Sequence, residues 1–177
     1  MSLTVETGAG IAGAESYASV TSADTYWAKR AHTAFATSWA AGTTGNKEGA
    51  LREATAYIDA TYGNYYLGQR AGYVQGLLWP RTNACDDDGY YLPALPQCLI
   101  DACCELAARA LSARLASDAE HGGKVKREMK QIGDLKKEIE YMGSATADKR
   151  YGYIDGLLAA ILNGSQPSAG GASWNWR

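Results

Sequence analysis

The chain has 177 residues with a formal net charge of −2 at pH 7, and 46% of them are hydrophobic. This length and composition fit one domain with a buried core, and the small net charge excludes a global electrostatic attraction to nucleic acid or membranes. No run of apolar residues approaches the roughly 18 that a membrane span needs, and residues 1–6 lack the pattern of a signal peptide.

The apolar residues recur at helical spacing in three long stretches of the chain. Before them, residues 3–20 are rich in Gly, Ala, Ser and Thr and predict an extended arm followed by a loop. A first helix is expected from Ser22, a favourable N-cap, to residue 41, and a second over residues 46–63. A third helix begins at Pro96 and runs to residue 117, and its apolar stripe makes it the candidate for the central core helix.

Between the second and third helices, residues 63–95 are interrupted by glycines and prolines and predict irregular structure. Pro80 lacks an amide donor and biases Trp79 toward extended geometry, so a large aromatic side chain is held beside Arg81. Two interpretations stay open: a connector whose Trp79 caps the core, or a shelf for another chain, because Trp and Arg are enriched at interface hot spots. We expect a structural Trp79 and an Arg81 that contacts another chain.

Three local patterns fall short of a cofactor or metal site. Residues 8–13 have the G-x-G-x-x-G spacing without the strand and helix that a dinucleotide site requires. Residues 86–89 look like part of a calcium loop, but Ala84 and Leu95 stand where carboxylates are required, so we expect a solvated turn. The spacing of the cysteines matches no zinc pattern and indicates buried thiols in a reducing compartment: Cys85, Cys98, Cys103 and Cys104. With no P-loop, HExxH, GxSxG or CxxC motif, we expect no metal, no cofactor and no catalysis.

The last third of the chain contains a lysine-rich stretch and an aromatic tail. Around Gly133 and Asp134, alternating apolar and charged residues favour a β-hairpin, although the Lys and Glu content also permits a helix. A short helix is expected over residues 155–163. The tail, residues 164–177, is a Gly/Ser/Ala linker with two indoles and a guanidinium at its end, and is either disordered or a peptide that docks into a partner's groove.

These elements predict a mainly α fold. We expect a small bundle of about four helices with a long central helix, an extended N-terminal arm, a β-hairpin-like arm and a flexible C-terminal tail. Residues 1–163 form one helical domain, from which residues 118–143 protrude as the arm, and residues 164–177 are the tail.

The order of these features resembles the head–tail connector (adaptor) proteins of tailed bacteriophages, a family that includes proteins labelled DnaT-like single-stranded-DNA-binding proteins. The resemblance covers residues 1–117 and, more loosely, residues 118–162. Glu15 departs from the Asn expected there. The segments that carry the resemblance are E-S-Y at 15–17, A-D-T-Y at 23–26, L-R-E-A-T-A-Y-I-D at 51–59, G-Q-R at 68–70, Q-G-L-L-W-P-R at 75–81, and Leu95-Pro96 before Ala102, Glu105, Leu106 and Ala107.

The resemblance implies a structural protein of the virion neck, made in the host bacterial cytoplasm and not bound to a membrane. Such proteins assemble as a ring, commonly twelve-fold, beneath the portal protein; the ring extends the channel for double-stranded DNA and carries the next neck or tail component, such as a stopper. A cyclic ring needs two different faces of each copy to meet.

The implied sites follow from that architecture. The C-terminal segment of such proteins often inserts into the portal, and the mildly basic arm would line the DNA channel. The expected portal-binding residues are Trp174, Asn175, Trp176 and Arg177. The expected subunit-interface residues are Arg70, Trp79, Arg81, Asp86, Asp87 and Asp88. The expected channel residues are Lys124, Lys126, Arg127 and Lys130.

The alternative is a small DNA-binding module of the DnaT-like, single-stranded-DNA-binding kind. Single-strand binders combine a basic groove with stacking aromatic side chains. Twelve Tyr and five Trp residues supply the aromatics. However, Arg70 and Arg81 alone are too few for a groove, and the total charge is negative.

Overall fold

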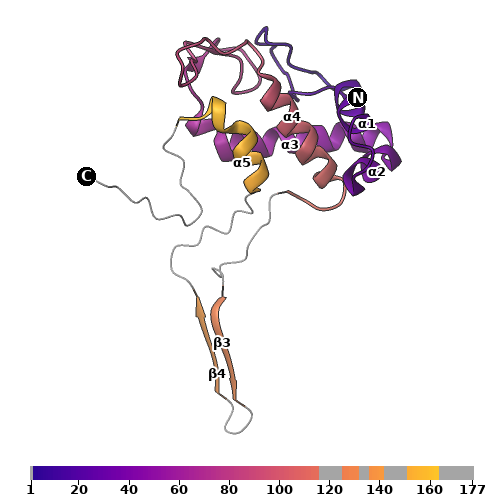
Figure 1. Cartoon of the computed structure of the whole chain (residues 1–177), viewed down its shortest axis with the longest axis vertical. Helices are drawn as coiled ribbons and strands as arrows, with labels where there is room; N and C mark the ends of the chain where they lie inside the picture. Colours follow the sequence, from indigo (N-terminus) through magenta and orange to yellow (C-terminus); the bar gives the residue numbers. More distant parts are fainter. Residues whose placement is uncertain (1, 116–124, 132–135, 142–150, 164–177) are drawn as a thin grey trace, which may run out of the picture.

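The computed structural model describes residues 2–115, 125–131, 136–141 and 151–163, and its fold is mainly helical, as the sequence predicts. The α-helices are α1 (Val20–Ala28), α2 (Ala34–Ala41), α3 (Thr44–Tyr62), α4 (Gln97–Ala110) and α5 (Gly152–Leu158), with short 3-10 helices at Gly63–Tyr65 and Ala159–Ile161. Strand β1 (Gln69–Arg70) pairs antiparallel with β2 (Arg81–Thr82), and β3 (Val125–Gln131) with β4 (Lys136–Tyr141). Figure 1 shows the helices gathered in one body from which the β3–β4 hairpin projects.

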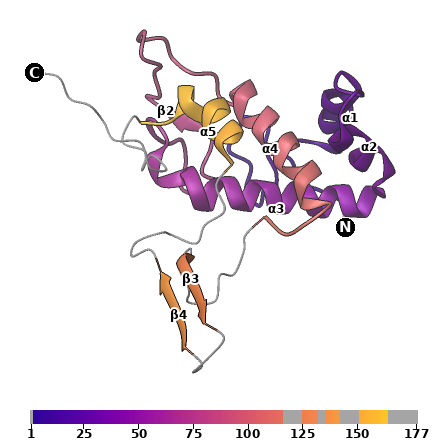
Figure 2. The same cartoon turned by 60° about the horizontal axis from the view of Figure 1, so that its bottom comes forward.

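Helix α4 is the centre of the core, because every residue from Ala102 to Ala108 is buried. It packs against α3, and α1, α2 and α5 also contact it; Figure 2 shows α4 and α5 lying over the long α3. Small side chains such as Ala54 on α3 and Ala102 on α4 are fully buried, which lets the two backbones approach closely. The prediction that the third helix is the central one is therefore confirmed, although it ends at Ala110 and not near residue 117.

The expected first helix, residues 22–41, is wrong: the structure has two helices there. The N-cap of α1 is Ser19, whose Oγ accepts a 3.0 Å hydrogen bond from the amide of Ser22. The break lies at Thr33, whose hydroxyl donates to the carbonyl of Arg30 and accepts from the amide of Ala36. This side chain caps α2 and offers the backbone an alternative to continuing α1. The last helix also begins earlier than expected, at Gly152, and ends in a 3-10 turn.

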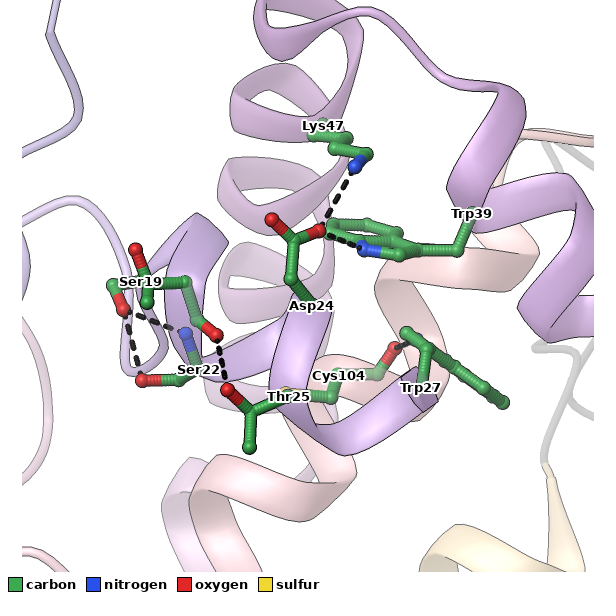
Figure 3. Close-up of polar contacts among 9 residues, drawn as sticks. Ser19, Ser22, Asp24, Thr25, Trp27, Trp39, Lys47 and Cys104 are labelled. Carbon is green, nitrogen blue, oxygen red and sulfur yellow. Dashed lines mark hydrogen bonds and ion pairs between the residues drawn. The ribbon is translucent and has the colours of Figure 1, made fainter. Parts of the chain in front are cut away.

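A shared carboxylate fixes α2 and α3 against α1. Asp24 Oδ1 accepts a 2.8 Å hydrogen bond from Trp39 Nε1 and lies 2.8 Å from Lys47 Nζ, as Figure 3 shows. On the other side of α1, Trp27 Nε1 donates to the carbonyl of Cys104 on α4. Three helices are thus tied to α1 by polar contacts in addition to the buried apolar surface.

The β3–β4 hairpin confirms the hairpin interpretation of the lysine-rich stretch. The strands pair antiparallel from Val125 opposite Tyr141 to Gln131 opposite Lys136, with an irregularity between Val125 and Arg127. The expected tail, residues 164–177, lies outside the described residues. In the described part of the chain, no helix is long and apolar enough to cross a membrane.

The N-terminal segment wraps around one buried carboxylate. Glu6 is 1% exposed, and its two oxygens accept hydrogen bonds of 2.8–3.0 Å from the amides of Thr7, Gly8, Gly10 and Ile11. These amides form a backbone nest of the kind that elsewhere binds anions. The G-x-G-x-x-G stretch therefore surrounds a side chain of its own chain. Among the described residues, no strand precedes it and no helix directly follows it, so it is not a dinucleotide-binding loop.

Gly68 and Gly49 form a matched pair for testing how the loops after α3 are held. Gly68 has φ +70°, and a Cβ there would lie 2.4 Å from the carbonyl oxygen of Thr82. We expect Gly68→Ala to lower the free energy of unfolding by about 2 kcal/mol or more. Gly49 lies on the exposed face of α3 with nothing within 4 Å of its Cβ position, so Gly49→Ala should raise it by about 0.5–1 kcal/mol. Urea unfolding followed by circular dichroism measures both, and equal effects would contradict the described loop geometry.

Candidate functional site

The segment from Gln75 to Arg81 forms the root of two surface loops. Trp79 is fully buried, and its ring packs edge-on against Tyr66 with centroids 5.6 Å apart. Its amide donates a 3.1 Å hydrogen bond to the hydroxyl of Tyr17, and its peptide bond to Pro80 is cis. The indole belongs to the core and has no exposed surface for a neighbouring subunit, which corrects its assignment to a subunit interface and confirms its expected structural role.

The guanidinium of Arg81 also faces into the chain. Nε donates to the carbonyl of Leu67 at 2.6 Å, Nη2 to that of Gly68 at 2.7 Å, and Nη1 to that of Leu78 at 3.3 Å. Burial lowers the pKa of Arg81 from its ordinary value, as expected for a cation held against neutral carbonyls. Arg81 thus braces the backbone on both sides of the loops, and the donors that we expected to reach another chain are used internally.

Asp59 on α3 anchors the same root. Its carboxylate accepts hydrogen bonds from the Leu78 amide at 3.0 Å, from the Tyr17 hydroxyl at 2.6 Å and from the Tyr66 hydroxyl at 3.3 Å. Burial raises the pKa of Asp59 above its ordinary value, while these three bonds favour the ionised form. Burial and the neighbouring Asp59 carboxyl together raise the pKa of both tyrosines. The loop root is therefore fixed to the centre of the bundle.

Two loops that leave this root, residues 71–76 and 84–92, are named here the tyrosine loops. They carry four of the large apolar side chains that the body exposes: Tyr73 is 98%, Val74 75%, Tyr90 72% and Tyr91 77% exposed. The first loop is closed by bonds from the Ala71 amide to the Pro80 carbonyl and from the Gly72 amide to Gln75 Oε1. These side chains are thus exposed on an ordered backbone.

The second tyrosine loop is shaped by an aspartate. Asp86 Oδ1 accepts hydrogen bonds from the amides of Asp88 at 3.1 Å and Tyr90 at 2.8 Å, while the Asp86 amide donates to the Tyr90 carbonyl. This is the solvated turn that the sequence predicts. Asp87 and Asp88 are exposed beside Tyr90, and Arg70 is exposed at the base of the first loop. Within the described residues, no cluster of His, Cys, Asp and Glu is placed to hold a metal ion.

A groove between α1 and α4 is a second candidate, and the sequence did not predict it. Its volume is about 620 Å³. Most of the residues that line it have a polar side chain: Ser19, Thr21, Ser22, Thr25, Tyr26, Lys29 and Arg30 from the α1 region and Gln97, Ile100, Asp101 and Cys104 from α4.

The two cations of this groove are neighbours in the chain, and neither is neutralised by a carboxylate in the described part of the chain. Lys47, Arg52 and Arg109 form ion pairs, whereas Lys29 and Arg30, like Arg70 and Arg81, form none with the described residues. Arg30 stacks over the Tyr26 ring at 3.6 Å and donates to the Tyr26 carbonyl. The signal that could have revealed them was present, because they are the one pair of adjacent basic residues before residue 116. In a continuous helix over residues 22–41 the two cations would lie mid-helix, whereas in the structure they directly follow the end of α1.

The remaining predicted site residues lie in the β3–β4 hairpin or outside the described part of the chain. Arg127 and Lys130 stand opposite Glu140 and Lys137 in the hairpin ladder, and Lys126 lies at its irregularity. Their proposed place in a DNA channel stays a prediction. The other predicted residues lie outside the described part of the chain: Lys124, Trp174, Asn175, Trp176 and Arg177.

Comparison with known families gives one result. The model of the family described as "Putative DnaT-like ssDNA binding protein" matches residues 1–174. Because the match covers nearly the whole chain, the chain belongs to this family. No curated protein and no solved structure gives a match. The DnaT-like part of the resemblance is thus confirmed, and the head–tail connector part stays a prediction.

Arg81→Lys tests the bracing role of the guanidinium. The substitution keeps the charge, but one ammonium group cannot reproduce a planar fork that reaches three carbonyls. We expect the free energy of unfolding to fall by about 2–3 kcal/mol in urea titrations. The control is Arg70→Lys, because Arg70 is exposed and donates one bond, to the Gln75 carbonyl. In this variant the free energy of unfolding should fall by only about 0.5 kcal/mol. Similar losses in both variants would show that Arg81 does not brace the loops.

Proposed function

We propose that this chain binds single-stranded DNA, and that a strand contacts it in the groove between α1 and α4. Membership of a family described as single-stranded-DNA-binding supports the activity. The observation that carries the location is the adjacent Lys29 and Arg30, which form no ion pair with the described residues and line a groove with several hydroxyl groups. In this role, and in the second one below, the chain acts by binding and not by catalysis.

The chemistry of the groove fits a phosphodiester backbone. Lys, Arg, Ser and Thr side chains are common donors to phosphate oxygens and carry no sequence information. The guanidinium of Arg30, stacked on Tyr26, also presents a flat face on which a base can stack. Asp101 is the one acidic residue in the lining, and Gln97 Nε2 donates to it at 2.8 Å.

Charge sets the expected strength of this binding. Residues 2–115 and 151–163 contain eight basic and twelve acidic residues, so the body as a whole repels a polyanion. Binding through two cations releases few counterions from the DNA. This predicts that the logarithm of the binding constant falls with the logarithm of the salt concentration with a slope of about −1.4 for a single strand. We therefore expect weak, sequence-independent binding that fades at physiological salt.

Fluorescence anisotropy with a labelled oligothymidylate tests both parts of this proposal. The full-length chain should bind at low salt, and Lys29→Ala combined with Arg30→Ala should weaken binding about tenfold or more, since each lost phosphate contact is worth about 1 kcal/mol.

Two control variants accompany this titration. Lys29→Arg keeps the charge and should keep the affinity, and Arg70→Ala removes a cation at the tyrosine loops and should change little. Absence of binding by the full-length chain would refute the activity. Binding that survives the double substitution would refute only the groove as its site.

A second candidate function, the head–tail connector of a tailed phage, is favoured by a different observation. The tyrosine loops expose large apolar side chains on an ordered backbone, which is typical of surfaces that bind other proteins. The sequence motifs around residues 51–59 and 75–81 also support it. The family description supports DNA binding more directly. As a connector, the chain would join a ring beneath the portal in the virion neck, with the next neck protein on its other side.

Native mass spectrometry of the chain mixed with the portal protein of its phage tests the connector role. We expect a complex with the full-length chain that is lost when residues 164–177, with their two indoles, are deleted. The deletion should leave the oligonucleotide affinity unchanged, because the groove lies between α1 and α4. A portal complex that survives the deletion would refute tail docking, and no complex at all would refute the connector role.

A further inference from the structure

We propose that the tyrosine loops of one copy of this chain bind the β3–β4 hairpin of a second copy. This inference does not depend on the DNA-binding proposal, because it concerns a different surface. It specifies which two parts of the chain meet if copies assemble.

The loops form a surface suited to a protein partner. Tyr73, Tyr90 and Tyr91 are each more than 70% exposed, so their rings pack little against their own chain. The backbone beneath them is held by Gln75, Arg81 and Asp86, so little entropy remains to be lost when a partner binds. Tyrosine rings on a rigid backbone are effective anchors in interfaces.

Charge restricts the chemistry of the partner. The two loops contain three acidic residues and no basic one. Asp86 is engaged in its turn, while Asp87 and Asp88 are exposed next to Tyr90. A complementary partner therefore combines basic residues with apolar ones.

The hairpin has this composition. The β3 and β4 segments together contain five basic and three acidic residues, in addition to Val125, Met129, Ile139 and Tyr141. The rest of the described chain is net acidic, so the hairpin and the body are electrostatically complementary.

A hairpin of this kind needs a partner surface. An isolated two-stranded hairpin is at best marginally stable in water, and both of its edges present unpaired backbone groups. Among the described residues, β3 and β4 pack against each other, and Figures 1 and 2 both show the hairpin projecting away from the helices. In both views the loops that join α3 to α4 lie on the opposite side of the body, so a second copy is the source of the hairpin that they would bind.

Such a contact joins two different surfaces. A heterologous contact repeats from copy to copy and produces a closed ring or an open chain, depending on the rotation between neighbours. The proposal therefore predicts oligomers that grow with concentration and do not stop at a two-fold dimer.

Charge reversal on each side of the contact gives the test. The loop variant carries Asp87→Lys and Asp88→Lys, and the hairpin variant carries Lys136→Glu and Lys137→Glu. Sedimentation velocity of the full chain should show self-association, and each variant alone should weaken it about tenfold or more. An equimolar mixture of the two variants should associate again, because each hairpin then meets loops of opposite charge.

Two controls separate docking from misfolding. Circular dichroism should show unchanged helix content in both variants, since Asp87 and Asp88 are exposed. Tyr153→Ala removes an exposed ring outside the loops and should leave association unchanged, whereas Tyr90→Ala with Tyr91→Ala should weaken it. A full chain that stays monomeric, variants that associate like the unmodified chain, or a mixture that fails to recover would each overturn the proposal. None of these outcomes bears on oligonucleotide binding.

Discussion

The burial of the Trp79 indole is the constraint on which the exposed part of the molecule depends. Truncating a buried aromatic side chain typically costs about 3–5 kcal/mol, so this residue holds the irregular segment firmly to the bundle. Tyr17 and Asp59 secure the backbone at residues 78 and 79, and Arg81 ties together the two ends of the first loop. Because the root is fixed in this way, the loops beyond it can expose tyrosines without collapsing onto the core.

Several charged side chains of the body organise its own backbone. Glu6 and Asp86 accept hydrogen bonds from backbone amides, and Arg81 donates to backbone carbonyls. Irregular segments thereby obtain the hydrogen bonds that helices and sheets supply elsewhere. Lys29 and Arg30 form no ion pair with the described residues and are the one adjacent pair of basic residues before residue 116, and this pairing in sequence distinguishes the α1–α4 groove from the rest of the body.

The sequence predicts the elements whose pattern is local, and it misses those set by distant partners. The periodicity of α3 and the alternation of β3 and β4 need only neighbouring residues, and both predictions hold. The division between α1 and α2 depends on one hydroxyl, at Thr33, within an otherwise helical pattern. For the loops, Trp79 is equally consistent in sequence with a core or an interface, and only the contacts of residues far away in the chain, such as Tyr17, decide between them.

Helix α3 connects two separate parts of the body. Its first turns meet the α1–α2 side, where Lys47 lies against Asp24, and its last turn reaches the loop root, where Gly63 lies against Leu78. A helix of 19 residues spans about 28 Å, so the packing of α1 and α2 and the packing of the loop root are set at opposite ends of one rigid element. The α1–α4 groove and the tyrosine loops share no residue, so a DNA strand and a second copy of the chain would contact different side chains.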